Sequence, residues 1–255
     1  MPIRVTRSVI PSLFTTMNLF SGFVAIVEAT EGDYVTAAWF IVLAVIFDGL
    51  DGMLARLTNT ASEFGVELDS LADVVSFGVA PSFILYMAFF HQWEAIGMLI
   101  AGLPAMTGAL RLARFNVQLS GFDKSHFLGL PIPAAALTAI SYLVFHHLSD
   151  DSIPPTELKP AFLTILTLGV SLLMVSTIRY DTFPKPTPRA IKKSPVKFAI
   201  ALVGIVSIIV TKGKAIFPFM LLYLVYGMIR QAVFLLRHEE DDDTIEEPDT
   251  TPFDI

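Results

Sequence analysis

The chain has 255 residues, of which 54% are hydrophobic and only 16% are charged, and its mean hydropathy is +0.65. Soluble domains carry about 25% charged residues, so this composition excludes an ordinary water-soluble domain, and it is far too apolar for a disordered chain. The absence of Cys excludes disulfide scaffolds, thiolate metal sites and a Cys nucleophile. The composition therefore predicts a polytopic membrane protein.

The net charge of −7 is unevenly distributed along the chain. Nine of the 24 acidic residues lie within 239–255, a stretch that has no Lys or Arg. The remaining 15 acidic residues are set against 17 basic ones, so the body of the chain has a net charge of +2. A slightly basic body suits an anionic lipid surface or a phosphate-bearing substrate. We therefore expect a transmembrane domain over 1–237, which holds every candidate catalytic residue, and an acidic, disordered cytoplasmic tail over 238–255.

Apolar runs of about 20 residues, the length that crosses a bilayer as a helix, recur along the whole chain. They predict an all-α, integral-membrane bundle of about eight transmembrane helices. The first run follows a basic N-terminus without a convincing cleavage site, so we expect a retained helix rather than a signal peptide. In chain order, the predicted spans cover about 9–29, 34–56, 63–90, 94–117, 131–148, 160–178, 194–211 and 215–236.

Basic residues gather at the N-terminus and in the loops after the second, fourth and sixth predicted spans. The positive-inside rule places these segments, and with them the C-terminal tail, in the cytoplasm. Lys212 and Lys214, in the hairpin between the last two spans, go against this orientation. The pattern predicts a multi-pass protein of the cell membrane whose candidate active site faces the cytoplasm.

Four aspartates occupy the facing ends of the second and third predicted spans. Asp48 and Asp51 are three residues apart, and Asp69 and Asp73 are four apart, so each pair shares one face of its helix. The connection over 57–62 is short, which makes the two helices antiparallel neighbours. We therefore expect the four carboxylates to converge at similar depth, close to the cytoplasmic boundary.

Carboxylates clustered in apolar surroundings repel one another and need cations to be stable. Oxygen ligands suit Mg²⁺, Mn²⁺ or Ca²⁺, and two divalent ions would balance four carboxylates. Pairs of metal ions about 4 Å apart recur in enzymes that catalyse displacement at phosphorus. Neighbouring residues also fit a phosphate ligand: Gly52, Ala55 and Gly65 keep the surface small, and Arg56 can bind phosphate through two nitrogens.

These residues form a pattern that resembles the signature of the CDP-alcohol phosphotransferases. The pattern reads Asp48-x2-Asp51-Gly52-x2-Ala55-Arg56-x8-Gly65-x3-Asp69-x3-Asp73. The resemblance implies an integral-membrane enzyme with a six-helix core that forms a homodimer. It also implies a CDP-linked lipid donor, an alcohol acceptor and CMP as the leaving group.

Within that family the chain is most similar to the phosphatidylserine synthases. The similarity lies in the sequence around Asp69 and Asp73, in Arg111-Leu-Ala-Arg114-Phe-Asn116 and in 127–133. Phosphatidylglycerophosphate synthases usually have Lys after the last Asp, where this chain has Val74. The resemblance therefore implies CDP-diacylglycerol or CDP-archaeol as donor and L-serine as acceptor, with membrane lipids as surroundings and no nucleic-acid partner.

The resemblance also implies roles for individual residues. Asp73 would be the general base that takes the proton of the serine hydroxyl. Two divalent cations, Mg²⁺ or Mn²⁺, with Ca²⁺ as a further candidate ion, would be held by Asp48, Asp51, Asp69 and Asp73. Residues expected to contact the CDP-lipid are Thr15, Gly52, Ala55, Arg56, Ser62 and Gly65.

The acceptor pocket is less determined by sequence. Arg111 and Arg114 either anchor the chain at the cytoplasmic surface or bind the serine carboxylate or lipid phosphate, and Asn116 could shape the pocket. Two alternatives to serine transfer stay open. One keeps the chemistry but uses glycerol phosphate or inositol phosphate as acceptor, and the other, ranked lower, is a divalent-cation transporter.

Overall fold

The computed structural model describes residues 9–58, 62–120, 129–149, 155–178, 180 and 195–242, and every regular element among them is a helix. The α-helices alternate with short π- and 3₁₀-helical segments, which are named η. In chain order the elements are α1 (Val9–Thr30), α2 (Tyr34–Thr58), α3 (Glu63–Asp73), η1 (Val74–Val79), α4 (Ala80–Ala88), η2 (Phe90–Trp93), α5 (Glu94–Ser120), α6 (Ile132–Tyr142), η3 (Leu143–His147), η4 (Thr156–Leu158), α7 (Lys159–Val175), α9 (Pro195–Val210) and α10 (Ile216–Asp242).

Each of the eight predicted spans coincides with a helical segment, so the all-α prediction is confirmed. Six of the described helices are long and apolar enough to cross a membrane. The predicted fifth span is the shorter apolar segment Ile132–His147, and the predicted seventh is α9, which has 16 residues. A helix of 16 residues extends about 24 Å, less than the roughly 30 Å hydrocarbon core, so length separates these two segments from the other six.

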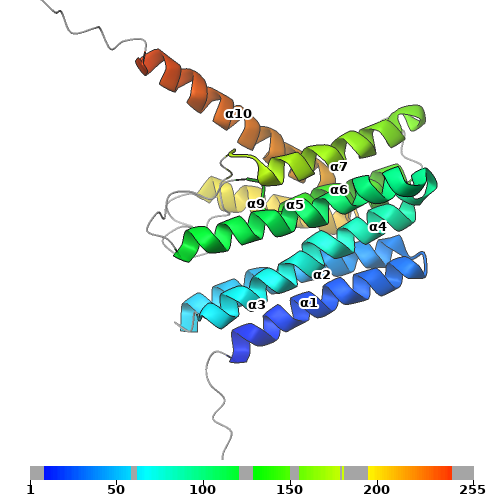
Figure 1. The fold of residues 1–255 in the computed structure, drawn as a ribbon, viewed down its shortest axis with the longest axis horizontal. Helices are drawn as coiled ribbons and strands as arrows, with labels where there is room; N and C mark the ends of the chain where they lie inside the picture. The colour runs from blue at the N-terminus through cyan, green and yellow to red at the C-terminus, as the bar shows by residue number, and fades with distance from the viewer. Residues whose placement is uncertain are drawn as a thin grey trace, which may run out of the picture.

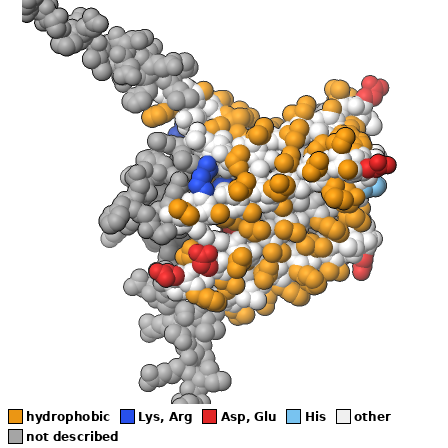
Figure 2. Space-filling model, in the orientation of Figure 1, with side chains coloured by type: hydrophobic (Ala, Val, Ile, Leu, Met, Phe, Trp, Pro, Cys, Tyr) orange, Lys and Arg blue, Asp and Glu red, His pale blue; other side chains and the backbone are white. Residues whose placement is uncertain are grey.

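The helices from α1 to α7 lie side by side as a bundle, and α10 projects away from it (Figure 1). Hydrophobic side chains cover the middle of the visible face, whereas acidic side chains lie towards its two ends (Figure 2). This distribution is the one expected of a multi-pass membrane protein, because charged side chains avoid the hydrocarbon region.

The α1–α2 hairpin turns within three residues. Gly32 has φ +83°, the left-handed conformation that commonly ends a helix. Asp33 then caps α2, because its carboxylate accepts hydrogen bonds from the Thr36 backbone N–H at 3.0 Å and from the Thr36 hydroxyl at 2.7 Å. These bonds, the backbone one first, lower the pKa of Asp33 below its usual value. The tight turn makes α1 and α2 antiparallel neighbours, and the two helices pack against each other.

The span Glu63–Ala88 is the most buried of the six. It consists of α3, η1 and α4 in direct succession, and η1 is a π-helical segment that begins one residue after Asp73. Single π-helical turns within α-helices often occur at functional sites. The neighbouring α5 contains Pro104, and the N–H of Ala105 donates to the Ser82 hydroxyl of α4 at 3.1 Å. The central span is therefore fixed to α5.

The structure differs from the sequence-based prediction at the start of the acidic tail. Helix α10 continues to Asp242, so residues 238–242 of the predicted disordered tail are helical. The physical reason is local, since the sequence from 216 to 242 contains no helix-breaking residue after Gly227 and the next Pro is at 248. The remainder of the predicted tail, 243–255, lies outside the described residues.

Candidate active site

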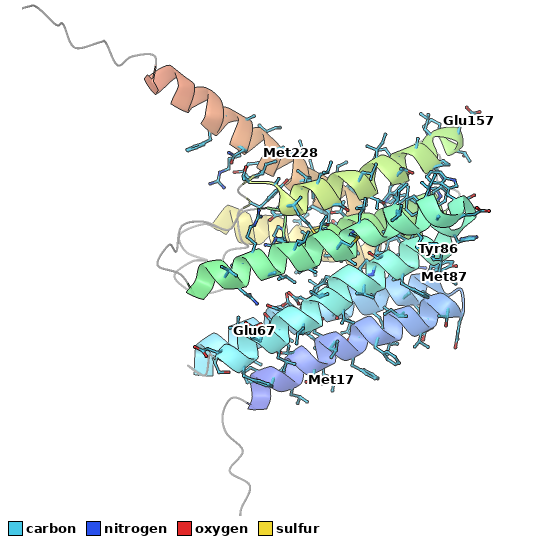
Figure 3. All side chains as sticks on the ribbon, viewed as in Figure 1. Met17, Glu67, Tyr86, Met87, Glu157 and Met228 are labelled. Carbon is cyan, nitrogen blue, oxygen red and sulfur yellow. The ribbon has the colours of Figure 1, made fainter. Side chains whose placement is uncertain are left out.

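The aspartates predicted to converge come from the end of α2 and from α3. Asp48, Asp51 and Asp69 each offer a carboxylate oxygen, and these oxygens all lie within 4.8 Å of one another. Asp73, one helical turn after Asp69, interacts electrostatically with the other three. Glu67, two residues before Asp69, lies near one end of the bundle, while Tyr86 and Glu157 lie near the opposite end (Figure 3). The cluster is therefore close to one end of the helical bundle.

Burial makes this arrangement unstable without a counter-charge. Asp51 is 5% exposed and Asp73 is 7% exposed. The Oδ1 atom of Asp69 is buried and accepts no hydrogen bond from any described residue. Removing carboxylates from water costs several kcal/mol per ion unless other charges compensate. An all-oxygen ligand set of this size fits one or two divalent cations such as Mg²⁺ or Mn²⁺.

Asn18 of α1 completes the surroundings of Asp73, and the sequence-based assignment of roles missed it. Its side-chain Nδ2 donates a hydrogen bond to Asp73 Oδ1 at 3.1 Å, and Asn18 itself is fully buried. Its backbone oxygen accepts a hydrogen bond from the hydroxyl of Ser76 in η1 at 2.9 Å. A signal was present in the sequence, because an Asn in the middle of an apolar span requires a polar partner.

The predicted CDP-lipid residues occupy different environments. Thr15 is buried on α1 and donates its hydroxyl to the Pro11 carbonyl one turn earlier at 3.2 Å. Ser62 is exposed and caps α3, because its Oγ accepts the Gly65 N–H at 3.1 Å. Gly52 and Ala55 are half-buried on the last turns of α2. The Arg56 side chain lies outside the described residues, and the role of all these residues in donor binding stays a prediction.

The two arginines of α5 have different contacts in the structure. Arg114 donates from its guanidinium to the backbone oxygens of Val175 at 3.2 Å and Ser176 at 3.3 Å, at the C-terminal end of α7. A cation there satisfies carbonyls that have no partner within the helix and complements the helix dipole. Arg111, by contrast, interacts electrostatically with Asp73, and its buried Nε makes no hydrogen bond with a described residue. Arg111 thus lies near Asp73, and Arg114, which also interacts electrostatically with Arg111, contacts the end of α7.

Asn116, the third predicted acceptor residue, connects two helices near the site. Its Nδ2 donates to the Ser70 hydroxyl at 3.0 Å and to the Glu67 carboxylate at 3.4 Å, so it ties α5 to α3 between Glu67 and Asp73.

A pair of tyrosines connects the end of α7 to α10. The rings of Tyr180, which follows α7, and Tyr223 on α10 lie with their centroids 5.5 Å apart, and burial raises the pKa of the Tyr180 hydroxyl. Tyr223 also interacts electrostatically with Arg111, so α10 lies near this arginine.

Comparison with known proteins connects this arrangement to a family. The chain is 39% identical over 231 residues to a Helicobacter pylori protein named CDP-diacylglycerol–serine O-phosphatidyltransferase, covering 89% of this chain and 92% of the relative. It is 35% identical over 218 residues to a Methanocaldococcus jannaschii protein of the same name, covering 85% and 90% of the two chains. It is 41% identical over 173 residues to the archaetidylserine synthase of Methanothermobacter thermautotrophicus, covering 67% and 69%.

The matched family region contains all four aspartates. The family described as CDP-alcohol phosphatidyltransferase matches residues 8–175, from the start of α1 to the end of α7. The resemblance seen in the sequence is thereby confirmed, and the chain belongs to the CDP-alcohol phosphatidyltransferase family.

Proposed function

We propose that the protein transfers the phosphatidyl or archaetidyl group of a CDP-linked lipid to the hydroxyl of L-serine and releases CMP. The observation that carries the proposal is the buried cluster of Asp48, Asp51 and Asp69 with Asp73 beside it. The names of the relatives support serine as the acceptor and a diacylglycerol or archaeol lipid as the donor. The active site would face the cytoplasm, and the protein would act as a homodimer.

The metal ions implied by the family would be held by Asp48, Asp51, Asp69 and Asp73. Bound there, divalent cations would offset the negative charge of the pyrophosphate and of the departing CMP. The chain supplies the small surface that a pyrophosphate needs, because Gly52 leaves the backbone of α2 without a side chain next to Asp51.

Asp73 would act as the general base, which is the role that the family resemblance implies for it. In the proposed step the serine oxygen forms a bond to the lipid-bound phosphorus, and the bond from phosphorus to the CMP oxygen breaks. The hydroxyl proton passes to the Asp73 carboxylate, and CMP leaves with the electron pair of the broken bond. A carboxylate is a weak base towards an alcohol, so the hydroxyl must already be held in position when the bond forms.

Arg111 supports serine over a phosphorylated acceptor. A guanidinium binds a carboxylate through two nitrogens, and the serine carboxylate carries a single charge. Glycerol phosphate and inositol phosphate carry more charge and call for additional cations. Because the Arg114 guanidinium donates to the end of α7, Arg111 is the arginine of α5 directed towards Asp73.

The deciding experiment is an acceptor panel. Purified protein with Mn²⁺ or Mg²⁺ and radiolabelled CDP-diacylglycerol is given L-serine, glycerol 3-phosphate or inositol 1-phosphate, and CMP and lipid products are separated and counted. The proposal expects CMP release and a lipid product with serine. Product with a phosphorylated alcohol instead would assign the other acceptor class, and absence of CMP with every alcohol would refute the transferase proposal.

A further inference from the structure

Asn18 makes a direct contact with the proposed base from a helix that carries none of the four aspartates. Its Nδ2 donates to Asp73 Oδ1 at 3.1 Å, although the two residues are 55 positions apart in the chain. Both side chains are buried, Asn18 completely and Asp73 to all but 7%. Hydrogen bonds to an ionised carboxylate are stronger than neutral ones, and burial protects them from competition by water.

A second contact joins α1 to η1 close to Asp73. Ser76 is fully buried in η1, and its hydroxyl donates to the backbone oxygen of Asn18 at 2.9 Å. One turn further along α1, Gly22 lies so close to Ser76 that a Cβ added there would be 2.5 Å from the Ser76 Oγ. Helix α1 therefore contacts Asp73 through Asn18, and Ser76 through both Asn18 and Gly22, which leaves the Asn18 side chain little freedom to turn.

Packing alone does not account for an amide at this position. The Oδ1 atom of Asn18 is buried and makes no hydrogen bond with any residue that the structure describes. A buried carbonyl without a partner is unfavourable, and a Leu side chain of similar size would avoid that cost. What an amide offers here, and a Leu does not, is the N–H that it donates to Asp73. An Asp at position 18 would instead add a fifth negative charge to the four aspartates.

We propose that Asn18 is a positioning residue for the base: its amide holds Asp73 Oδ1 and so fixes the orientation of the carboxylate that takes the serine hydroxyl proton. This inference rests on the proposed function, in which Asp73 is that base. The terminal torsion of an Asp side chain is broad, so a carboxylate without a fixed partner samples many orientations. Asn18 takes no proton itself and acts only through Asp73.

The test compares Asn18→Leu with Ser21→Ala in the full-length protein. Ser21 is a matched control, because it is also a buried polar residue of α1 but donates to its own helix, to the Met17 carbonyl at 2.8 Å. A catalytic group displaced by about 1 Å can lower the rate by about 100-fold. We therefore expect Asn18→Leu, in which the Asp73 carboxylate is no longer held, to lose about that factor in kcat. Its KM for serine and its affinity for CDP-diacylglycerol in Mn²⁺ should stay close to wild type, as should its Tm. Ser21→Ala should keep the wild-type kcat.

A milder variant keeps the test decisive if Asn18→Leu folds poorly. Ser76→Ala removes the hydroxyl that anchors the Asn18 backbone and should lower kcat by about tenfold with an unchanged KM for serine. The positioning role would be overturned if Asn18→Leu kept the wild-type kcat. It would also be overturned if Asn18→Leu and Ser76→Ala both had a lower kcat together with a changed KM and a lower Tm. Wild-type protein that makes no serine lipid would instead refute the proposed function, so the two failures are told apart by the wild-type reaction.

Discussion

The tight packing of Gly22 on α1 against Ser76 gives a prediction whose size can be worked out from distances. A Cβ at Gly22 would lie 2.5 Å from Ser76 Oγ and 2.6 Å from Ser76 Cα, whereas ordinary contacts are 3.4–4 Å. Because the second atom belongs to the backbone, a rotamer change cannot relieve the clash. In Gly22→Ala, α1 must therefore move by about 1 Å relative to η1, and such overpacking costs about 1–3 kcal/mol of stability.

The same displacement moves Asn18 away from Asp73 without removing any chemical group. A misplacement of about 1 Å can cost about 100-fold in rate, so we expect kcat for serine transfer to fall by about that factor. Mn²⁺ binding, measured by calorimetry, should survive, because the aspartates lie on α2 and α3. Steady-state kinetics and thermal unfolding are measured together on the same preparations.

Gly102→Ala is the matched control for this variant. Gly102 is also a helical glycine, on α5, but an added Cβ would meet nothing within 4 Å. Ala is favoured over Gly within a helix by about 0.5–1 kcal/mol, so this control should be as active as wild type and at least as stable. If Gly22→Ala kept both wild-type kcat and wild-type Tm, the claim that α1 sets the geometry of Asp73 would be refuted.

Three further predictions follow from separate parts of the structure. Hydrogen bonds from Thr36 lower the folded-state pKa of Asp33, so its ionised form stabilises α2 at neutral pH; Asp33→Ala should lower Tm at pH 7, and the difference should disappear as the pH falls through that lowered pKa. Arg114→Ala should lower Tm through the loss of the α7 contacts, whereas Arg111→Ala should mainly raise the KM for serine; equal effects on KM would contradict the division between the two arginines. Mn²⁺ at 100 times the wild-type Kd should stabilise the wild-type protein by about 2.7 kcal/mol; at that same Mn²⁺ concentration Asp69→Asn should gain less, and without metal its Tm should be higher than that of wild type.

The helices and the aspartate cluster could be predicted from local patterns. Runs of apolar residues determine which segments become helices, and the three- and four-residue spacings of Asp48 with Asp51 and of Asp69 with Asp73 put each pair on one helix face. The short connection between α2 and α3 then brings the pairs together. Each apolar run is local, and the aspartate pattern lies within residues 48–73, which is why sequence reasoning could reach both.

Partners that are distant in the chain could not be found in the same way. The bond from Asn18 to Asp73 depends on how α1 packs against α3 and η1. The contacts that distinguish Arg114 from Arg111 depend on the end of α7, whose carbonyls are 61 and 62 residues from Arg114. Both arginines share one helix face, so spacing alone gives them the same environment, and only the packing of the other helices distinguishes them.

The central claim is that the serine oxygen attacks the lipid phosphorus with Asp73 as base. The most direct measurement supplies L-serine carrying ¹⁸O in its hydroxyl to wild type and to Asp73→Asn with CDP-diacylglycerol and Mn²⁺, and follows the label by mass spectrometry. The account predicts that wild type places the label in the serine lipid and none in CMP, and that Asp73→Asn binds donor but forms no lipid product. Label in CMP, or product formed by Asp73→Asn at the wild-type rate, would contradict it.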